Sequence, residues 1–248
     1  DIFVANYKQP DRLYLNDGLG NFERLTEGSI VTASGRSTSV QMVDVNGDGR
    51  PDIVRASPNS NPRTRVDINN GNGWTQDDNW VWPDCTSGEH AGCIVTNDNP
   101  PQDNGVRFTD LNGDGLTDII KARNSIRRAF INAGYGPWTD DGNWHPNCVG
   151  GSQDEEVCFV DNNGLDTGTR IGDINGDGLA DLLIGAAGAD PINGSDAGSS
   201  YVVFGTTSSA AIELSAIEAG EGGGFVINGA ASGDGSGGSV AAAGDING

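Results

Sequence analysis

The stretch Asp110-Leu-Asn-Gly-Asp-Gly-Leu-Thr-Asp118, followed by Ile119-Ile120, decides the fold of this chain. The same pattern occurs at residues 44–54 as Asp-Val-Asn-Gly-Asp-Gly-Arg-Pro-Asp-Ile-Val. It occurs again at residues 173–183 as Asp-Ile-Asn-Gly-Asp-Gly-Leu-Ala-Asp-Leu-Leu, and its first four residues return at 245–248. An acidic motif that recurs at intervals of 63 to 72 residues indicates a repeat architecture.

The copies of this acidic motif begin 66, 63 and 72 residues apart. The chain opens with Asp1-Ile-Phe-Val, which matches the end of the motif, so both ends of the sequence cut a repeat at nearly the same phase. We therefore predict a single repeat domain over residues 1–248 that is a fragment of a longer array. The approximate repeats are 1–43, 44–109, 110–172 and 173–244, and residues 245–248 start a further loop.

Short runs of branched and apolar residues predict strands. Such runs follow each acidic motif directly, and others occur between the motifs, at 13–15, 66–68, 129–131 and 201–204. Clusters of Gly, Asn and Asp separate them, which is typical of strands joined by turns. No stretch keeps a helical apolar period over three turns. We predict an all-β fold of β-propeller-type blades, each of about four antiparallel strands, with about four repeats present.

The residues around the third motif resemble a known family. The run Leu-Ile-Gly-Ala-Ala-Gly at 183–188 and the pair Phe204-Gly205 resemble the FG-GAP repeat of integrin α-subunit propellers and their bacterial relatives. Residues 223–229 and 239–245 look like the next copy, and the two middle units resemble VCBS-type repeats of secreted bacterial toxins and surface proteins. The proline of the family's Gly-Ala-Pro is absent at 185–188. The resemblance implies that the chain is part of a larger, seven-bladed propeller.

The spacing of oxygen-bearing side chains in the acidic motif indicates calcium binding. Positions 1, 3, 5 and 9 supply carboxylates and an amide, position 7 can give its backbone carbonyl, and Gly at positions 4 and 6 lets the loop wrap around an ion. Oxygen-only ligands favour Ca²⁺ over zinc or copper. We predict about three complete, structural Ca²⁺ sites. Their ligands are Asp44, Asn46, Asp48, Arg50 and Asp52; Asp110, Asn112, Asp114, Leu116 and Asp118; and Asp173, Asn175, Asp177, Leu179 and Asp181; Asp245 and Asn247 begin a fourth site.

An EF-hand loop and an ion-free turn are the two alternatives for the acidic motif. An EF-hand loop continues to a glutamate at position 12, but position 12 is Arg55 or Lys121 in the first two copies, and the flanking segments are predicted strands. An ion-free turn of Asp, Asn and Gly is plausible for one copy. Three copies, each with three carboxylates that repel one another, favour a divalent cation that removes the repulsion.

The four cysteines fall in the two middle units, one pair in each. We predict the bridges Cys85–Cys93 and Cys148–Cys158, because the two units are close duplicates; free thiols are the alternative. Zinc binding would need closer Cys-x-x-Cys spacing. Disulfides together with calcium sites indicate a secreted or cell-surface location.

All five tryptophans also lie in these two units, within inserted segments. One interpretation is a binding surface for a glycan or protein partner, with Trp82, Trp74, Trp138 and His145 as its candidate residues. The other is that Trp74, Trp80, Trp138 and Trp144 pack the insertions against the edges of the blades. Trp82 has no counterpart in the other unit and is the residue expected to be exposed.

Composition excludes several classes of function. The net charge of −21 and the sequence pI near 4.1 argue against nucleic-acid binding. No apolar run reaches the length of a membrane span, so membrane insertion is not expected. No Ser/His/Asp, Cys/His or phosphate-binding arrangement can be assembled, so we expect no enzymatic activity.

The predicted function is that of a non-catalytic, extracellular calcium-binding β-propeller repeat protein for adhesion, recognition or assembly. Its partner would be a protein or glycan at the cell surface, or a second copy in a larger assembly. Residues 171–248 carry ten acidic residues and no Lys or Arg, which fits a basic partner surface as well as a simple solvated surface. The alternatives are a lectin-like, glycan-binding module and an accessory propeller of a larger secreted toxin or enzyme.

Overall fold

The structure is a computed structural model of residues 1–248. It describes the chain except for residues 7–8, 33–36, 38, 57–63, 81–92, 96–101, 124–125, 143–157, 162, 209–211 and 242–248. The described part is almost entirely strands and turns, with two short helices, α1 (Ser29–Thr32) and α2 (Leu214–Glu218). No described helix has the length and apolar character that crossing a membrane requires. The all-β prediction is confirmed.

The strands form four antiparallel sheets in which neighbours in the sequence are neighbours in the sheet. The first sheet has three strands, and each of the others has the predicted four. They are β1 (Ile2–Val4), β2 (Arg12–Asn16) and β3 (Phe22–Leu25); β4 (Ser39–Val43), β5 (Asp52–Ala56), β6 (Thr64–Asn69) and β7 (Trp74–Gln76); β8 (Val106–Thr109), β9 (Asp118–Arg123), β10 (Ile126–Ile131) and β11 (Thr139–Asp140); and β12 (Thr169–Gly172), β13 (Asp181–Ala186), β14 (Ser199–Val203) and β15 (Gly224–Asn228). Simple up-and-down sheets of this size are the blades of a propeller.

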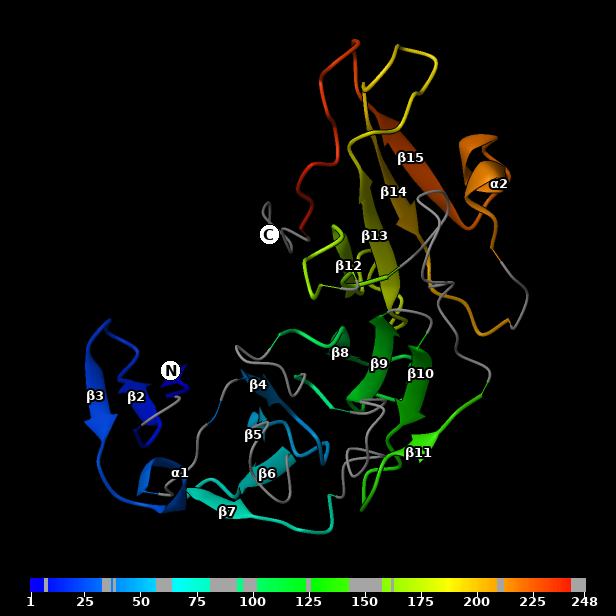
Figure 1. Ribbon diagram of the computed structural model, residues 1–248. Helices are drawn as coiled ribbons and strands as arrows, with labels where there is room; N and C mark the ends of the chain where they lie inside the picture. Colours follow the sequence, from blue (N-terminus) through cyan, green and yellow to red (C-terminus); the bar gives the residue numbers. More distant parts are fainter. Residues whose placement is uncertain are drawn as a thin grey trace.

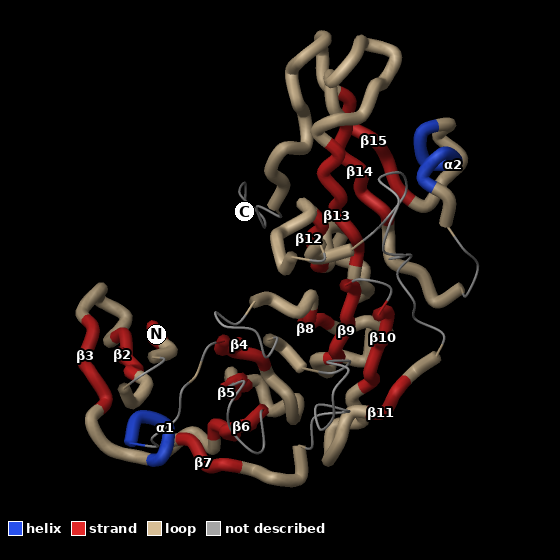
Figure 2. The backbone as a smooth tube through the Cα atoms, in the orientation of Figure 1, coloured by secondary structure: helices blue, strands red, loops and turns tan. Residues whose placement is uncertain are grey.

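The four sheets follow one another in chain order around an arc, from β1–β3 to β12–β15 (Figure 1). Outside the sheets, the described residues form mainly turns and loops, apart from the short helices α1 and α2 (Figure 2). Closure into a seven-bladed ring stays a prediction.

Apolar cores lie between successive sheets, because residues next to each other on a strand point to opposite faces. In β5, Ile53 packs toward the first sheet, whereas Val54 packs toward the third. In β9, Ile119 packs toward the second sheet and Ile120 toward the fourth. We call these two sides of a sheet its preceding face and its following face. Each core between sheets therefore joins a following face to a preceding face.

The acidic motifs lie in the loops that connect the first and second strands of the last three sheets. The loop from Asp44 leads from β4 into β5, and the equivalent loops join β8 to β9 and β12 to β13. The sequence repeats, which we counted from the acidic motifs at 44, 110 and 173, therefore begin one strand later than the sheets do. The flanking strands also agree with the rejection of an EF-hand.

Candidate functional site

The three acidic loops share one backbone conformation, which their glycines make possible. In the first loop Gly47 and Gly49 have φ angles of +73° and +80°, and the equivalent glycines of the other two loops lie between +78° and +86°. Residues with a side chain rarely adopt this left-handed region, whereas glycine enters it without steric cost. The glycines at positions 4 and 6 of the motif therefore let the loop curl around the side chain at position 1.

The aspartate at position 1 lies at the centre of each curl. The carboxylate of Asp44 accepts hydrogen bonds from the backbone N–H of Gly47 at 2.8 Å and of Gly49 at 2.7 Å. Asp110 and Asp173 accept the same two bonds in their own loops, at distances between 2.7 and 3.0 Å. These bonds satisfy the backbone donors at the start of the loop and fix its conformation.

Positions 3 and 5 also face the backbone of the loop. Asn46 Oδ1 accepts the N–H of Asp48 at 3.1 Å, and Asp48 Oδ1 accepts the N–H of Arg50 at 2.9 Å. The other two loops repeat both contacts. Each loop is therefore a series of side-chain-closed turns built from the oxygens that the sequence predicts as metal ligands.

The aspartate at position 9 is buried and joins three segments of chain. Both oxygens of Asp118 accept backbone bonds, from Leu111 at 2.9 Å within the loop and from Asn132 at 2.7 Å at the end of β10. Asp52 and Asp181 are buried in the same way and make the equivalent contacts. This carboxylate holds the first turn of the loop and the next strand of the sheet in place even without an ion.

The electrostatics of the loops show a deficit of positive charge. Burial, together with the negative charges of Asp114 and Asp110, raises the pKa of Asp118 to about 6. Burial and the charges of Asp48 and Asp44 raise the pKa of Asp52 in the same way. A divalent cation would remove this repulsion.

The donor set of the loops fits Ca²⁺. It consists of carboxylate, amide and backbone oxygens, and a carboxylate oxygen that accepts one N–H bond keeps a further lone pair for a cation. Within the described residues no three His, Cys, Asp or Glu side chains already converge as a metal cage. The residues that would hold the ion are those at positions 1, 3, 5, 7 and 9. Asp245 and Asn247 of the incomplete fourth loop lie outside the described residues.

The first loop differs from the other two at position 7, where Arg50 replaces a leucine. The guanidinium of Arg50 lies 2.6 Å from Asp48 Oδ2 and also donates to the carbonyl of Asn69 at 3.0 Å. The guanidinium of Arg50 therefore neutralises part of the negative charge of this loop. The loops at 110–118 and 173–181 have no such group at position 7, because Leu116 and Leu179 stand there.

Neighbouring acidic loops touch one another, which the sequence alone did not indicate. The side chain of Leu116 lies against Gly47 of the preceding loop, and Leu179 lies against Gly113 in the same way. Asn132 donates from Nδ2 to the carbonyl of Val45 in the first loop at 2.7 Å and to that of Thr117 at 3.1 Å. Asn69 makes the equivalent backbone contact with Asp52 at the end of β6, but its Nδ2 donates to the carbonyl of Pro51 in its own loop.

The structure places two of the five tryptophans in a core. Trp80 and Trp138 are buried in the core between the second and third sheets, with ring centroids 5.1 Å apart. Trp138 also donates from Nε1 to the carbonyl of Thr117 at 3.0 Å. With only 4% of its surface exposed, Trp138 is a packing residue, and its assignment to a binding surface is wrong.

The remaining candidates for the binding surface stay untested. Trp74 is half-buried and packs against the core between the first and second sheets. Trp82 and His145 lie outside the described residues. The predicted disulfides also stay untested, because Cys85 and Cys148 lie outside the described residues. Their predicted partners Cys93 and Cys158 are buried, and no described cysteine is a free thiol.

The comparisons with known proteins confirm the predicted repeat family. Residues 1–55 match the FG-GAP-like repeat family, and residues 168–203 match the FG-GAP repeat family. The first match spans the first sheet, β4, the loop at 44–52 and most of β5, and the second spans β12, the loop at 173–181, β13 and β14. The resemblance of the middle units to VCBS-type repeats stays a prediction. No curated protein matches the chain in sequence.

Among solved structures, a lectin from Agrocybe aegerita is similar to this chain at 15% sequence identity and a TM-score of 0.47. That lectin is described by its specific recognition of non-reducing terminal N-acetylglucosamine. The similarity covers 86% of this chain and 50% of the lectin chain, so the chain spans half of the lectin's length.

Proposed function

We propose that this chain is a calcium-binding, propeller-type repeat module of a secreted or cell-surface protein, which serves adhesion, recognition or assembly and carries out no catalysis. The observation that carries the proposal is the repetition of one acidic loop in three successive sheets. In each loop, the backbone curls around the aspartate at position 1, and the side-chain oxygens at positions 3, 5 and 9 accept hydrogen bonds from the same loop. Such a set of oxygens is the donor chemistry of a calcium site.

The role of the ion is structural in this proposal. The carboxylate at position 9 already pins the loop to the end of the third strand of its sheet, as Asp118 does with Asn132. An ion bound to that carboxylate would tie the connection between the first two strands to the third. Because the loops touch one another through Leu116 and Leu179, three bound ions would stiffen one edge of the whole row of sheets.

The extracellular location and the disulfides Cys85–Cys93 and Cys148–Cys158 belong to the same proposal. Extracellular calcium modules bind at about 10⁻⁴ to 10⁻³ M, a range in which the ion is available outside the cell. The described cysteines Cys93 and Cys158 lie in the cores on either side of the third sheet. The glycan-binding alternative has less support, because Trp138, one of its candidate residues, is buried in a core.

Calorimetric titration with CaCl₂, combined with thermal unfolding, tests the proposal. We expect about three Ca²⁺ per chain and a melting temperature that falls in excess EGTA. A free Ca²⁺ concentration of 100 times the Kd stabilises the folded chain by about 2.7 kcal/mol for each site. Mg²⁺ at the same concentration should raise the melting temperature less than Ca²⁺ does.

Loop variants make the test specific. Asp110→Asn should remove one site and most of the calcium-dependent rise from that loop, because it takes a charge from position 1. The matched control is Glu27→Gln, which removes one exposed acid outside the loops. A calcium stoichiometry of zero, or a melting temperature that EGTA leaves unchanged, would refute the proposal.

A further inference from the structure

A series of buried hydrogen bonds joins the first two acidic loops. It runs from Asp118 to Asp52, the carboxylates at position 9 of the two loops, and it passes through Asn132 and Val45. The backbone N–H of Asn132 donates to Asp118 Oδ1 at 2.7 Å, and its Nδ2 donates to the carbonyl of Val45 at 2.7 Å. The N–H of Val45 in turn donates to Asp52 Oδ2 at 3.0 Å. All four residues are at most 1% exposed, so water does not compete for these bonds.

The side chain of Asn132 is held in one orientation. Its Nδ2 also donates to the carbonyl of Thr117, the residue before Asp118, at 3.1 Å. Its Oδ1 accepts the N–H of Gly134 at 2.8 Å. Both donors and the acceptor of the amide are therefore engaged. A shift of the position-9 carboxylate in the second loop is passed on to the carbonyl that Asn132 holds in the first.

The second and third acidic loops lack this connection. The residue that donates its backbone N–H to Asp181 is Gly205, at 2.7 Å, so a glycine takes the place of Asn132. Glycine has no side chain that could reach the loop at 110–118. A Cβ atom at Gly205 would lie 2.6 Å from the carbonyl oxygen of Ala180, so a larger residue does not fit there.

The other contact between neighbouring loops is common to both pairs. Leu116 lies against Gly47, and Leu179 lies against Gly113 in the same way. Repulsion between two bound cations would also act in both pairs. The loops at 110–118 and 173–181 are therefore an internal reference, which keeps these effects and lacks the connection that Asn132 makes in the first pair.

We propose that Asn132 couples the calcium sites at 44–52 and 110–118, so that an ion bound at either loop raises the affinity of the other. An ion at one loop fixes its position-9 carboxylate, and the bonds through Asn132 and Val45 then order the other loop. The second ion meets a loop that is already ordered, so its binding costs less conformational entropy. Asn132 is a positioning residue, because it contacts a predicted ligand and not the ion.

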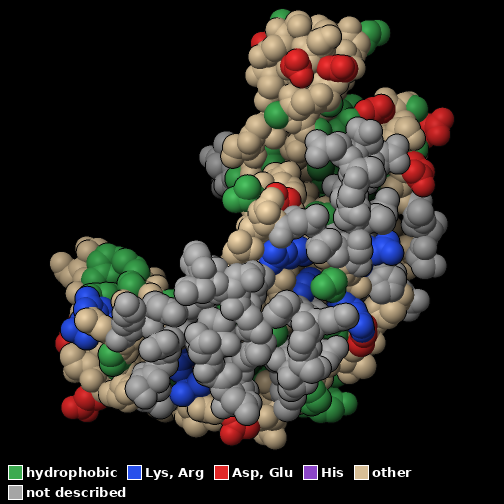
Figure 3. Space-filling view, viewed as in Figure 1, with side chains coloured by type: hydrophobic (Ala, Val, Ile, Leu, Met, Phe, Trp, Pro, Cys, Tyr) green, Lys and Arg blue, Asp and Glu red, His purple; other side chains and the backbone are tan. Residues whose placement is uncertain are grey.

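This coupling differs from a general attraction of the acidic surface for cations. Asp and Glu side chains gather over α2 and the loops beyond β13–β15, whereas Lys and Arg side chains lie over β3 and the middle sheets (Figure 3). Residues 171–248 carry ten acidic residues and no Lys or Arg. A general attraction would therefore favour the loop at 173–181 most, and it would not single out the first pair of loops.

This inference rests on the calcium part of the proposed function, and calorimetric titration of a set of 248-residue chains tests it. One chain keeps both loops of the first pair active and carries Asp173→Asn. Two others carry Asp44→Asn or Asp110→Asn in addition, so that one loop of the pair stays active. We expect each loop to bind Ca²⁺ at least about fivefold more tightly when the other is active, and by the same factor in both directions. The equivalent set for 110–118 and 173–181 should show a change of less than about twofold.

A variant of Asn132 assigns the coupling to its side chain. Asn132→Ala removes Nδ2 and keeps the backbone N–H that donates to Asp118, and we expect it to reduce the coupling to less than about twofold. A merely structural loss would weaken both loops and leave the ratio of affinities unchanged. The matched control is Asn69→Ala, because Nδ2 of Asn69 donates to the carbonyl of Pro51 within its own loop. This control should keep the full coupling.

Three outcomes would overturn the inference. The first pair of loops could bind Ca²⁺ independently, the second pair could be coupled as strongly as the first, or a folded Asn132→Ala chain could keep the full coupling. Circular dichroism shows whether each variant folds, and the comparison of the two pairs needs no change at Asn132. A chain that binds no Ca²⁺ would refute the proposed function and this inference together, whereas three ions bound without coupling would overturn this inference alone.

Discussion

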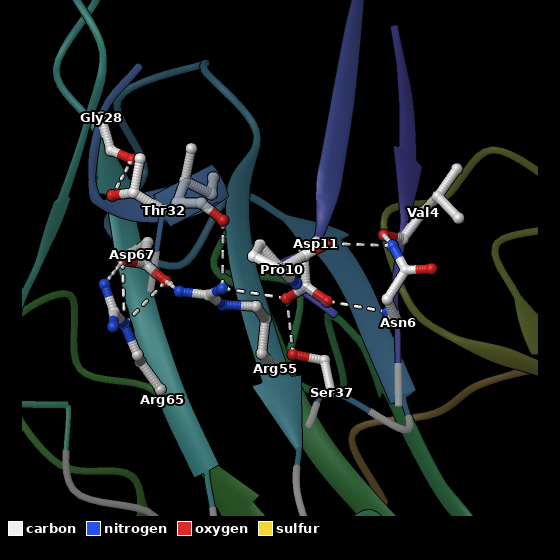
Figure 4. A network of polar contacts seen from close by, with 11 residues as sticks. Val4, Asn6, Pro10, Asp11, Gly28, Thr32, Ser37, Arg55, Arg65 and Asp67 are labelled. Carbon is white, nitrogen blue, oxygen red and sulfur yellow. Dashed lines mark hydrogen bonds and ion pairs between the residues drawn. The ribbon is translucent and has the colours of Figure 1, made fainter. Parts of the chain in front are cut away.

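Arg55 Nη1 lies 3.0 Å from Asp11 Oδ2, and the two side chains are almost completely buried between the first and second sheets. Figure 4 shows the network around them. Arg55 also contacts Asp67 at 2.7 Å, and Ser37 donates to Asp11 at 2.6 Å. Every group of this buried cluster has a partner, which is the condition under which charges are tolerated in a core.

Breaking this pair should strongly destabilise the chain. Asp11→Asn removes the charge that faces Arg55 from the first sheet, and we expect a loss of about 3 kcal/mol in the free energy of unfolding, as for other buried pairs. Urea unfolding in calcium-saturated buffer measures it. The matched control is Asp166→Asn, which opens the exposed pair of Asp166 with Arg170 and should cost less than about 1 kcal/mol. Equal losses in the two variants would contradict the prediction.

Replacing Arg50 should strengthen calcium binding at the first loop. Arg50 pairs with Asp48, one of the predicted ligands, and its charge repels an incoming cation. We expect Arg50→Leu, which copies the other two loops, to bind Ca²⁺ about two- to fivefold more tightly at this site, because an exposed pair of this kind contributes up to about 1 kcal/mol. Calorimetry resolves the change if Asp110→Asn and Asp173→Asn disable the other loops. Arg24→Leu is the charge-matched control, and an equal gain there would point to net charge alone.

The side chain of Leu116 should act on the loop before its own. Position 7 offers its backbone carbonyl to its own site, so Leu116→Ala keeps that ligand, but it removes the contact with Gly47. We expect weaker calcium binding at 44–52 and little change at 110–118. Calorimetry on chains that keep a single active loop separates the two effects. A loss confined to the loop at 110–118 would show that the contact between loops carries no coupling.

The sequence predicted the features that depend on local pattern. The spacing of Asp, Asn and Gly was enough to locate the three loops and the strands on either side, because a tight turn and a two-residue alternation are local properties. The partners of the buried charges were not predictable in this way. Arg55 meets Asp11 from 44 residues away, and Asn132 meets Val45 from 87 residues away. Such contacts depend on how whole sheets stack, which no short motif encodes.

The tryptophans show the same limit. Their concentration in the duplicated units was visible in the sequence, and so were both interpretations of it. Trp80 follows β7 of the second sheet and Trp138 precedes β11 of the third, and the two rings meet in one core. The two rings contact each other because the sheets stack, and this stacking cannot be read from the sequence around either tryptophan.

The predicted disulfides should hold the insertions of the middle units to the cores. Cys93 and Cys158 are buried in successive cores, so a bridge from each would anchor its own unit. Peptide mapping without reduction should recover Cys85 with Cys93 and Cys148 with Cys158. Replacing Cys85 and Cys93 together by Ala should cost about 2–4 kcal/mol, because a short loop loses its constraint in the unfolded chain. A bridge that joins the two units would contradict the duplication on which the pairing rests.

The stability of the chain should rise with pH above neutrality because of Lys121. Its side chain is completely buried in β9, and burial, with the charges of Arg123 and Arg128 nearby, lowers its pKa from 10.5 to about 7. Between these two values the unfolded chain binds more protons than the folded chain, so the free energy of unfolding increases with pH. Below about pH 7 both states carry the proton, and the cost of burying the ammonium is fully present.

Lys121→Met should remove this dependence, because methionine has a similar shape and does not titrate. We expect the parent chain to gain on the order of 2 kcal/mol more than the variant between about pH 7.5 and pH 9.5. Urea unfolding at fixed calcium concentration measures both. Lys121→Arg keeps the positive charge throughout this range. Its free energy of unfolding should be lower than that of the parent chain and should not change with pH. The same slope in the parent chain and in Lys121→Met would show that another group causes the rise and that the Lys121 amine stays protonated in the folded chain.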